Sequence, residues 1–390
     1  MVFLTKYIFK TGFLHKLPLP PSLKKQNMKQ ILLIILISKL SLSSFSQGEN
    51  DKTKAYEKAV EAIKLMDNGE IDKSIEMLKE SQKLDPDTYN YPYETAYAYY
   101  LKKDNIKAIK ELEKVLKYKE NNDQCYTLLG NIWDMEGQPE KAIEIYNQGL
   151  EKFPNSGRLY FEKGNVLEVL KKYDDALDTW EQGIGVNPSY PSNYHTASIY
   201  YCKYSTEKVW GILYGELFAN IERGSKKTEE ISKLLYDTYK SAITIKSETE
   251  AGVSFSKAAQ IPVSDKSENV KIPFSIPYEL TMVLAITSET KEKELGIKSF
   301  NNIRTAFIQE WFDKNRNTEY PNILFDWQKK LIDLGYFESY NYWLLMKGNE
   351  DEFEEWYNQN SEKFDKFIDW FSSNPMTIDD DNKFCRIQYE

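Results

Sequence analysis

The chain has 390 residues, which is enough for two domains and a large buried core. Its formal net charge is −9 at pH 7 and its pI is near 5.2. This acidity argues against broad nucleic-acid affinity, because phosphate binding needs a basic face. Aromatic residues make up 14% of the chain, a share that does not suit disorder.

A secretory signal peptide is predicted at residues 28–46. Basic Lys29 precedes the apolar run ILLIILI, and the SFS stretch at the end supplies small residues at the positions that a signal peptidase inspects. Cleavage would leave Gln47 first, so we expect an exported protein of the periplasm or cell envelope. The apolar run is far shorter than the roughly 20 residues of a membrane span, so we expect no transmembrane span in the mature form. We interpret residues 1–27 as an overextended start, with a genuine basic leader as the alternative.

A 34-residue period runs from Ala55 to Tyr190. Four windows of this length align small residues with small ones and large residues with large ones. The columns hold Ser74, Ala108, Ala142 and Ala176, then Leu78, Leu112, Tyr146 and Trp180, then Ala62, Ala96, Gly130 and Gly164. Each window is predicted to form two amphipathic helices, in which a small residue lets the other backbone approach and an aromatic fills the space beside it. We therefore interpret these columns as core, and we predict that Ala142 is buried between the two helices of its window.

The pattern of the third window resembles the tetratricopeptide repeat, W-x2-L-G-x2-Y, then A-x3-F, then P, on a period of 34 residues. The matching residues are Tyr126, Leu129, Gly130, Trp133, Ala142, Tyr146 and Pro154. The resemblance implies an all-α fold, with a helical-hairpin solenoid of four repeats over residues 55–190. The architecture is also similar to exported repeat proteins of Bacteroidetes-like bacteria with no assigned activity.

The period fails in a fifth window, where Trp210 falls at a position that requires a small residue. We interpret residues 191–243 as a degenerate repeat and capping helices, which cover the last apolar face of a solenoid. Residues 244–277 contain three prolines and are predicted to form a linker that holds a loop or a short hairpin. Residues 278–390 have apolar spacings of three and four, which indicates a mostly helical C-terminal domain. Its core aromatics are predicted to be Trp311, Trp327, Trp343, Trp356 and Trp370.

Signatures of catalysis and metal binding are scarce, and we expect no catalytic residue, metal or cofactor. His195 is the only histidine after the predicted signal peptide, too few for the usual zinc site, and we interpret it as a surface or groove contact. No glycines fit a phosphate-binding loop. The acidic run at 378–382 lacks the glycine and distal glutamate of a calcium loop and is interpreted as a solvated turn. The three cysteines include no CxxC pair, which leaves at least one free thiol, and Cys125 is expected to be half-buried.

Resemblance to the family also implies a ligand-binding groove, lined by the first helix of each repeat at its second, fifth, sixth, ninth and twelfth positions. Those positions hold Tyr93, Glu94, Tyr97 and Tyr100 in the second window, Thr127, Asn131 and Asp134 in the third, and Arg158, Phe161, Glu162, Asn165 and Glu168 in the fourth. Asn131 and Asn165 occupy the ninth place, where members that clamp a C-terminal carboxylate also have asparagine. The groove is acidic here, with Arg158 alone to oppose the carboxylates, so we expect a basic or aromatic-rich ligand.

The leading hypothesis is a non-enzymatic scaffold of the bacterial cell envelope that binds a protein or peptide in this groove. One alternative is an envelope enzyme whose repeats recruit a substrate for the C-terminal helical domain, although the sequence specifies no reaction. Another is an assembly role in which the aromatic C-terminal surface docks to a second envelope protein. A solvated helix face with no ligand is the remaining interpretation of the groove.

Overall fold

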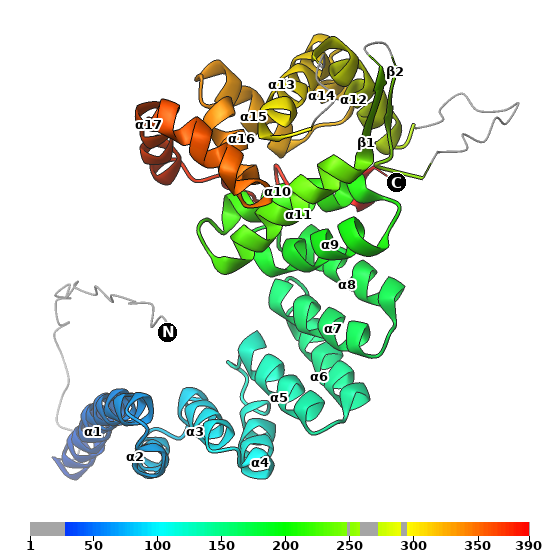
Figure 1. Ribbon diagram of the computed structural model, residues 1–390. Helices are drawn as coiled ribbons and strands as arrows, with labels where there is room; N and C mark the ends of the chain where they lie inside the picture. Colours follow the sequence, from blue (N-terminus) through cyan, green and yellow to red (C-terminus); the bar gives the residue numbers. More distant parts are fainter. Residues whose placement is uncertain (1–27, 248–249, 258–271, 290–294, 390) are drawn as a thin grey trace, which may run out of the picture. The chain divides into compact units, whose positions relative to one another are not determined.

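The computed structural model describes residues 28–247, 250–257, 272–289 and 295–389, and these are almost entirely helical (Figure 1). The elements are α1 (Met28–Asp67), α2 (Ile71–Leu84), α3 (Asn90–Leu101), α4 (Asn105–Val115), α5 (Asp123–Met135), α6 (Pro139–Lys152), α7 (Gly157–Val169), α8 (Tyr173–Val186), α9 (Pro191–Tyr204), α10 (Lys208–Ile221), α11 (Lys226–Ala242), β1 (Ile243–Ser247), β2 (Glu250–Val253), α12 (Ser275–Glu289), α13 (Ile297–Asp313), α14 (Arg316–Glu319), α15 (Ile323–Asp333), α16 (Phe337–Leu345), η1 (Met346–Gly348), α17 (Glu350–Ser373) and η2 (Arg386–Gln388). The predicted all-α fold is confirmed. Residues 1–27 lie outside the described part. No helix of the described chain is long and apolar enough to cross a membrane.

The chain divides into two compact units between Thr88 and Tyr89. The first unit contains the helix pair α1 and α2, which is the first predicted repeat. Ala62 of α1 and Leu78 of α2 are both fully buried, as the columns of the sequence require. The core of this pair therefore consists of the small and large residues that the 34-residue period selects.

In the second unit, α3–α4, α5–α6 and α7–α8 form the next helix pairs. The small column of the first helix packs directly on the large column of the second. A Cβ atom added at Gly130 would lie 2.2 Å from the Tyr146 ring, and one added at Gly164 would lie 2.2 Å from Nε1 of Trp180. Glycine is required at both places because no larger residue leaves room for the aromatic side chain. Ala142 is fully buried, which confirms its predicted place in the core.

The turns between paired helices repeat a left-handed backbone conformation every 34 residues. Gly69, Lys103, Gly137 and Lys171 have φ values of 83°, 62°, 72° and 60°. Glycine adopts this conformation freely, whereas a side chain in it is strained by about 1 to 2 kcal/mol. Two of the repeats therefore contain a strained lysine where the others have glycine.

The repeat geometry continues beyond the window in which the sequence pattern fails. Helices α9 and α10 pair as the earlier hairpins do, and Ser198 of α9 is buried against α10, to which its hydroxyl donates a hydrogen bond at Gly211 O (2.7 Å). Trp210 is also buried, with its ring 5.2 Å from that of Phe274 and 5.7 Å from that of Phe384. The large residue is accommodated because segments from the C-terminal region supply its contacts.

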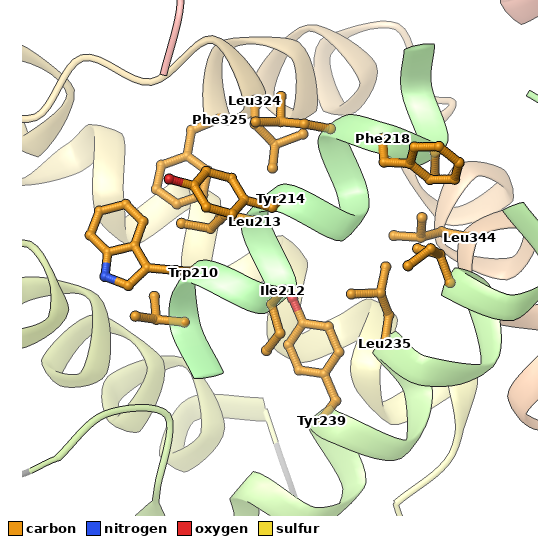
Figure 2. Close-up of a cluster of buried hydrophobic side chains, with 14 of the residues drawn as sticks. Trp210, Ile212, Leu213, Tyr214, Phe218, Leu235, Tyr239, Leu324, Phe325 and Leu344 are labelled. Atoms are coloured by element: carbon orange, nitrogen blue, oxygen red, sulfur yellow. The ribbon is translucent and has the colours of Figure 1, made fainter. Parts of the chain in front are cut away.

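The C-terminal helices share one hydrophobic core with the last repeats. This cluster extends from Leu167 to Tyr389, and Figure 2 shows the part of it in which side chains of α10 and α11 meet Leu324, Phe325 and Leu344. The strands β1 and β2 form an antiparallel hairpin within the segment predicted as a linker. The boundaries drawn from the sequence at residues 191, 244 and 278 stay predictions.

The tryptophans of the C-terminal region are core residues, as predicted. Trp311, Trp327 and Trp356 are buried, and Trp343 and Trp370 are partly buried against the same cluster. The three cysteines are all free and buried. The expectation of a half-buried Cys125 was wrong, because the side chain is fully enclosed.

A reciprocal substitution tests the turn geometry. Lys171→Gly should raise the free energy of unfolding by up to about 1 kcal/mol, because glycine removes the left-handed strain. Gly137→Lys should lower it by about 1 kcal/mol for the same reason, since nothing within 4 Å of a Cβ at Gly137 would add a clash. Urea unfolding followed by circular dichroism measures both.

Lys172→Gly is the matched control, because this neighbouring residue has a φ of −89°. Its substitution by glycine should lower the free energy of unfolding. Glycine relieves no left-handed strain at this position, and it has more conformational freedom than lysine in the unfolded chain. Changes of the same sign in Lys171→Gly and Gly137→Lys would contradict the assignment of strain.

Candidate ligand-binding face

The first helices of the repeats, α3, α5 and α7, lie side by side in the second unit. Side-chain caps fix where two of them begin. The Asn122 side chain accepts a hydrogen bond from the backbone N–H of Gln124 at the start of α5 (3.1 Å), and Ser156 accepts one from Leu159 at the start of α7 (3.3 Å). Ser156 also donates to Asp123 Oδ2 (2.5 Å), which joins the beginnings of the two helices. Equivalent positions on successive first helices thereby form rows across the repeats.

The predicted tyrosines Tyr93, Tyr97 and Tyr100 are half-buried on α3. The ring centroids of Tyr97 and Tyr100 are 6.0 Å apart. Burial and the neighbouring Glu94 raise the pKa of Tyr93, while Arg158 of α7 acts in the opposite direction. This part of the face is therefore an aromatic surface on which the Tyr93 hydroxyl stays protonated at neutral pH.

Predicted residues of α5 and α7 meet in one polar cluster. Asn131 Oδ1 accepts a hydrogen bond from the Tyr146 hydroxyl at 2.5 Å, and the Asn131 side chain also hydrogen-bonds Glu162. Burial raises the pKa of Glu162; Asn131 and Arg158 lower it, and Asp134 raises it. The structure thus brings together two carboxylates, one amide and one guanidinium, all half-buried, where α5 and α7 pack side by side.

The remaining predicted residues extend along α7. Phe161 is half-buried, with its ring centroid 6.2 Å from that of Tyr190, and its backbone carbonyl accepts a hydrogen bond from Trp180 Nε1 (3.3 Å). Asn165 is half-buried and Glu168 is exposed. A role for these side chains in binding a ligand stays a prediction.

One row of exposed apolar residues was missed by the sequence analysis. Leu101, Met135 and Val169 occupy the thirteenth position of successive windows and are 40%, 52% and 72% exposed. Each is one residue beyond a predicted groove position. The 34-residue register would have revealed the row if the neighbouring column had been inspected for apolar residues.

His195 does not lie on the surface. It is 8% exposed, its ring centroid is 4.9 Å from that of Phe218, and its Nε2 atom is 3.5 Å from Glu230 Oε2 of α11. Burial and the nearby Lys227 lower the pKa of His195, while Glu230 and Glu222 raise it. The interpretation as a surface or groove contact was wrong, because α11 packs over this part of α9.

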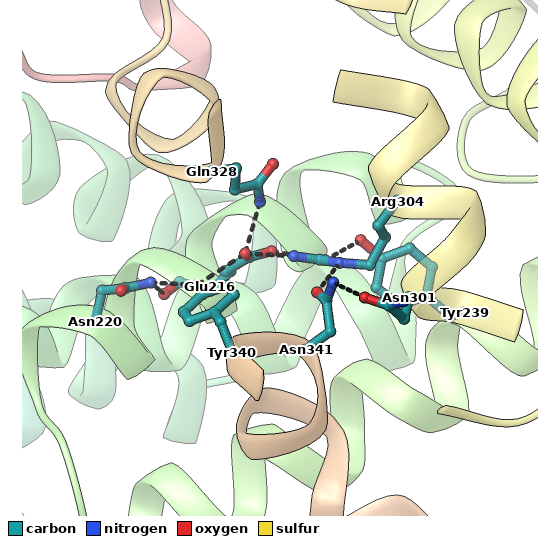
Figure 3. A network of polar contacts seen from close by, with 8 residues as sticks. All are labelled: Glu216, Asn220, Tyr239, Asn301, Arg304, Gln328, Tyr340 and Asn341. Carbon is teal, nitrogen blue, oxygen red and sulfur yellow. Dashed lines mark hydrogen bonds and ion pairs between the residues drawn. The ribbon is translucent and has the colours of Figure 1, made fainter. Parts of the chain in front are cut away.

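A second polar cluster lies deep among the C-terminal helices. Glu216 of α10 and Arg304 of α13 are 1% and 4% exposed, and the guanidinium donates to both carboxylate oxygens at 2.9 and 2.6 Å. The side chains around the pair, shown in Figure 3, are Asn220, Tyr239, Asn301, Gln328, Tyr340 and Asn341. Burial opposes the charge on Arg304, but Glu216 and the adjacent tyrosines raise its pKa. Most of these groups are buried and hydrogen-bond one another, so we interpret the cluster as part of the core.

An open cavity of about 530 Å³ lies beside α17, where Asn360 interrupts the helix with a φ of −130°. Two of its lining lysines are paired, Lys366 with Glu362 at 2.7 Å and Lys363 with Glu338. The described residues contain no group of three or more histidine, cysteine or acidic side chains that could hold a metal ion. In the acidic run, Asp379 accepts hydrogen bonds from the backbone of Asp381 and Asn382, which forms an exposed turn.

Residues 136–191, which span the second helix of the third repeat and the whole of the fourth, match the tetratricopeptide repeat family model. The photosystem I assembly protein Ycf3 of Synechococcus sp. (strain CC9605) is 31% identical over 102 residues, which is 22% of this chain and 59% of that protein. The TPR repeat-containing protein MJ1428 of Methanocaldococcus jannaschii is 32% identical over 107 residues, 27% of this chain and 19% of that protein.

Both relatives are therefore matched over less than two thirds of their own length. Among solved structures, that of pilF from Pseudomonas aeruginosa is 16% identical, covers 49% of this chain and 86% of its own, and has a TM-score of 0.41. The likeness to exported proteins of Bacteroidetes-like bacteria stays a prediction.

The protonation of Glu162 provides a test of the polar cluster. Its pKa is raised in the folded protein, so Glu162 contributes most to stability below its unfolded pKa, and that contribution is lost as pH rises through the folded pKa. The stability of Glu162→Gln relative to the wild type should therefore rise between about pH 4.5 and neutral pH. Urea unfolding at a series of pH values measures this difference.

Glu362→Gln on α17 should show the opposite slope, below about pH 4.5, because the hydrogen bond from Lys366 lowers the pKa of Glu362. Stability curves of the wild type and Glu162→Gln that run parallel across this pH range would show that Glu162 is not held in the cluster described.

Proposed function

We propose that the protein is an exported, non-enzymatic scaffold whose α3, α5 and α7 face binds a basic or aromatic-rich segment of a protein partner. The observation that carries this proposal is the cluster of Asn131, Asp134, Arg158 and Glu162 on one face of adjacent repeats. Tetratricopeptide repeats bind peptides and proteins through such faces, as the family resemblance implies. No bound group is needed to form the face, because its helices are fixed by the repeat core.

Charge favours a basic ligand. Glu94, Asp134, Glu162 and Glu168 lie on these helices, and Arg158 is the one cation among the predicted groove residues. Because Glu162 is partly desolvated, an incoming ammonium or guanidinium group would be attracted more strongly there than at a solvated carboxylate. A ligand that presents a carboxylate would instead be repelled.

Apolar contact area favours aromatic or aliphatic side chains in the same ligand. Tyr97 and Phe161 offer half-buried rings, and the row of Leu101, Met135 and Val169 lies one residue beyond the polar positions. Aromatic anchors often dominate the binding energy of such surfaces. A segment that alternates basic and apolar residues satisfies both parts of the face.

Export is proposed from the sequence of residues 28–46, which combines a basic start, a short apolar run and small residues before Gln47. A scaffold in the periplasm or cell envelope would meet its partner after both have crossed the inner membrane. The acidic net charge is compatible with a soluble mature form after cleavage.

Affinity capture from envelope extract, followed by titration calorimetry with the purified partner, tests the binding face. Phe161→Ala should weaken binding by more than about 1 kcal/mol, because it removes an aromatic contact. Glu168→Gln should mainly reduce the difference in affinity between low and high salt. Each titration is carried out at two salt concentrations.

Leu280→Ala is the control, because this side chain is 56% exposed on α12 and lies outside the predicted face. It should leave affinity unchanged. Wild-type affinity in both Phe161→Ala and Glu168→Gln would place the binding site elsewhere on the protein.

Export is tested separately with Ile34→Arg, which interrupts the predicted apolar run. Because the apolar core of a signal peptide drives insertion, this variant should accumulate in the cytoplasm, whereas Ile34→Leu should be exported normally. Cell fractionation and mass spectrometry of the mature N-terminus measure both. Undiminished export of Ile34→Arg would show that the signal is misplaced.

A further inference from the structure

Exposed apolar side chains concentrate at one edge of the repeats in the second unit. The side chains concerned lie where a first helix ends or a second helix begins, and they are Leu101, Ile106, Met135, Val169, Tyr173 and Tyr204. Large exposed apolar patches on a soluble protein commonly mark interaction sites. This edge is therefore a candidate for a second interaction site, separate from the predicted ligand-binding face.

The aromatic part of this edge forms a continuous surface across α7, α8 and α9. We call Val169, Tyr173, Tyr200 and Tyr204 the tyrosine patch. Val169, Tyr173 and Tyr204 are 72%, 46% and 71% exposed. The ring centroids of Tyr173 and Tyr200 are 6.4 Å apart, and those of Tyr200 and Tyr204 are 5.8 Å apart. Three aromatic rings from two helices thus form a row in which the Tyr200 ring contacts the other two. The rings at the ends of the row, Tyr173 and Tyr204, are exposed to solvent.

Carboxylates flank the tyrosine patch on both sides. Glu168 precedes Val169, Asp174 follows Tyr173, and both side chains are exposed. Burial raises the pKa of Tyr200, and Asp174, Tyr173 and Glu168 raise it further, which places both carboxylates close to this ring. Lys171 and Lys172 lie in the same turn. A partner would therefore be recognised by local pairing with the carboxylates rather than by the net charge of the edge.

We propose that the tyrosine patch is a docking surface for an arginine-containing segment of a partner protein, in which a guanidinium stacks on Tyr204 or Tyr173 and pairs with Glu168 or Asp174. Arginine fits this surface better than lysine because its planar group can stack on a ring while its N–H groups bind a carboxylate. The surface lies at the turn edge and overlaps the proposed α3, α5 and α7 face only at Glu168 and Val169. It extends the proposed function by a second point of contact.

The probe for this surface is a short synthetic peptide, capped at both ends, in which arginine alternates with glycine and serine. Matched peptides contain lysine or uncharged citrulline in place of arginine. Titration calorimetry with the intact protein should show binding of the arginine peptide, weaker binding of the lysine peptide and none of the citrulline peptide. Equal affinity for the arginine and citrulline peptides would overturn the proposal, as would no binding of the arginine peptide.

Substitutions then locate the binding. Tyr204→Ala and Tyr173→Ala should each reduce affinity for the arginine peptide about fivefold, the size of a moderate cation–π contact. Both side chains are well exposed, so the variants should keep the wild-type melting temperature. Tyr56→Ala is the matched control, because Tyr56 is an equally exposed tyrosine of the first unit, at 52%.

Phe161→Ala separates this surface from the predicted ligand-binding face. It should leave affinity for the arginine peptide unchanged, even if it abolishes binding of a captured partner. A loss of arginine-peptide affinity in Phe161→Ala, with none in Tyr204→Ala, would assign the peptide to the α3, α5 and α7 face and overturn the tyrosine patch. The two proposals can therefore fail independently.

Discussion

The buried ion pair between Glu216 and Arg304 is the contact on which the arrangement of the second unit depends. Removing two charges from water is costly, and it is tolerated only when each charge is paired and its remaining hydrogen-bonding groups are satisfied. Here Gln328 and Tyr340 donate to the carboxylate, while Tyr239 and Asn341 accept from the guanidinium. The partners come from α10, α11, α13, α15 and α16, so the network forms only when these five helices pack together. We infer that the pair specifies how the C-terminal helices join the last repeat, in addition to any stability that it contributes.

A second ion pair holds the end of the described chain against the repeats. Arg386 donates to Glu181 of α8, with its Nη2 atom 2.6 Å from Oε2, and the Tyr201 and Tyr214 hydroxyls donate to the same carboxylate. This contact places Phe384 against Trp210, the residue that breaks the sequence pattern of the repeats. The large residue at this position therefore has a packing role, because the C-terminal region packs against Trp210 and so covers the end of the solenoid.

Contacts that recur with the 34-residue period could be predicted from the sequence, whereas contacts between residues far apart in the sequence could not. The packing of Gly164 on Trp180 follows from columns that any alignment of the windows shows, because the same helix pair is built each time. Glu216 and Arg304 are 88 residues apart, and Arg304 belongs to no repeat, so nothing local distinguishes the two from solvated charges. His195 was misplaced for a related reason, since its position in the fifth window gives no indication that α11 covers it. On the candidate face, the register supplied the positions, but the contacts among Asn131, Tyr146 and Glu162 depend on side-chain conformation.

The covering of His195 also explains where the open face ends. In the repeats of α3, α5 and α7, the fifth position carries half-buried Tyr93, buried Thr127 and half-buried Phe161. In the next repeat the same position is His195, which α11 encloses beside Glu230. A ligand that binds along these fifth positions from α3 could therefore extend as far as α7 but not onto α9. Because α11 also carries Tyr239, which contacts Arg304, the buried network fixes the helix that forms this limit. The C-terminal region thus acts on the candidate face through packing, by holding α11 over the fifth repeat and leaving the preceding first helices accessible.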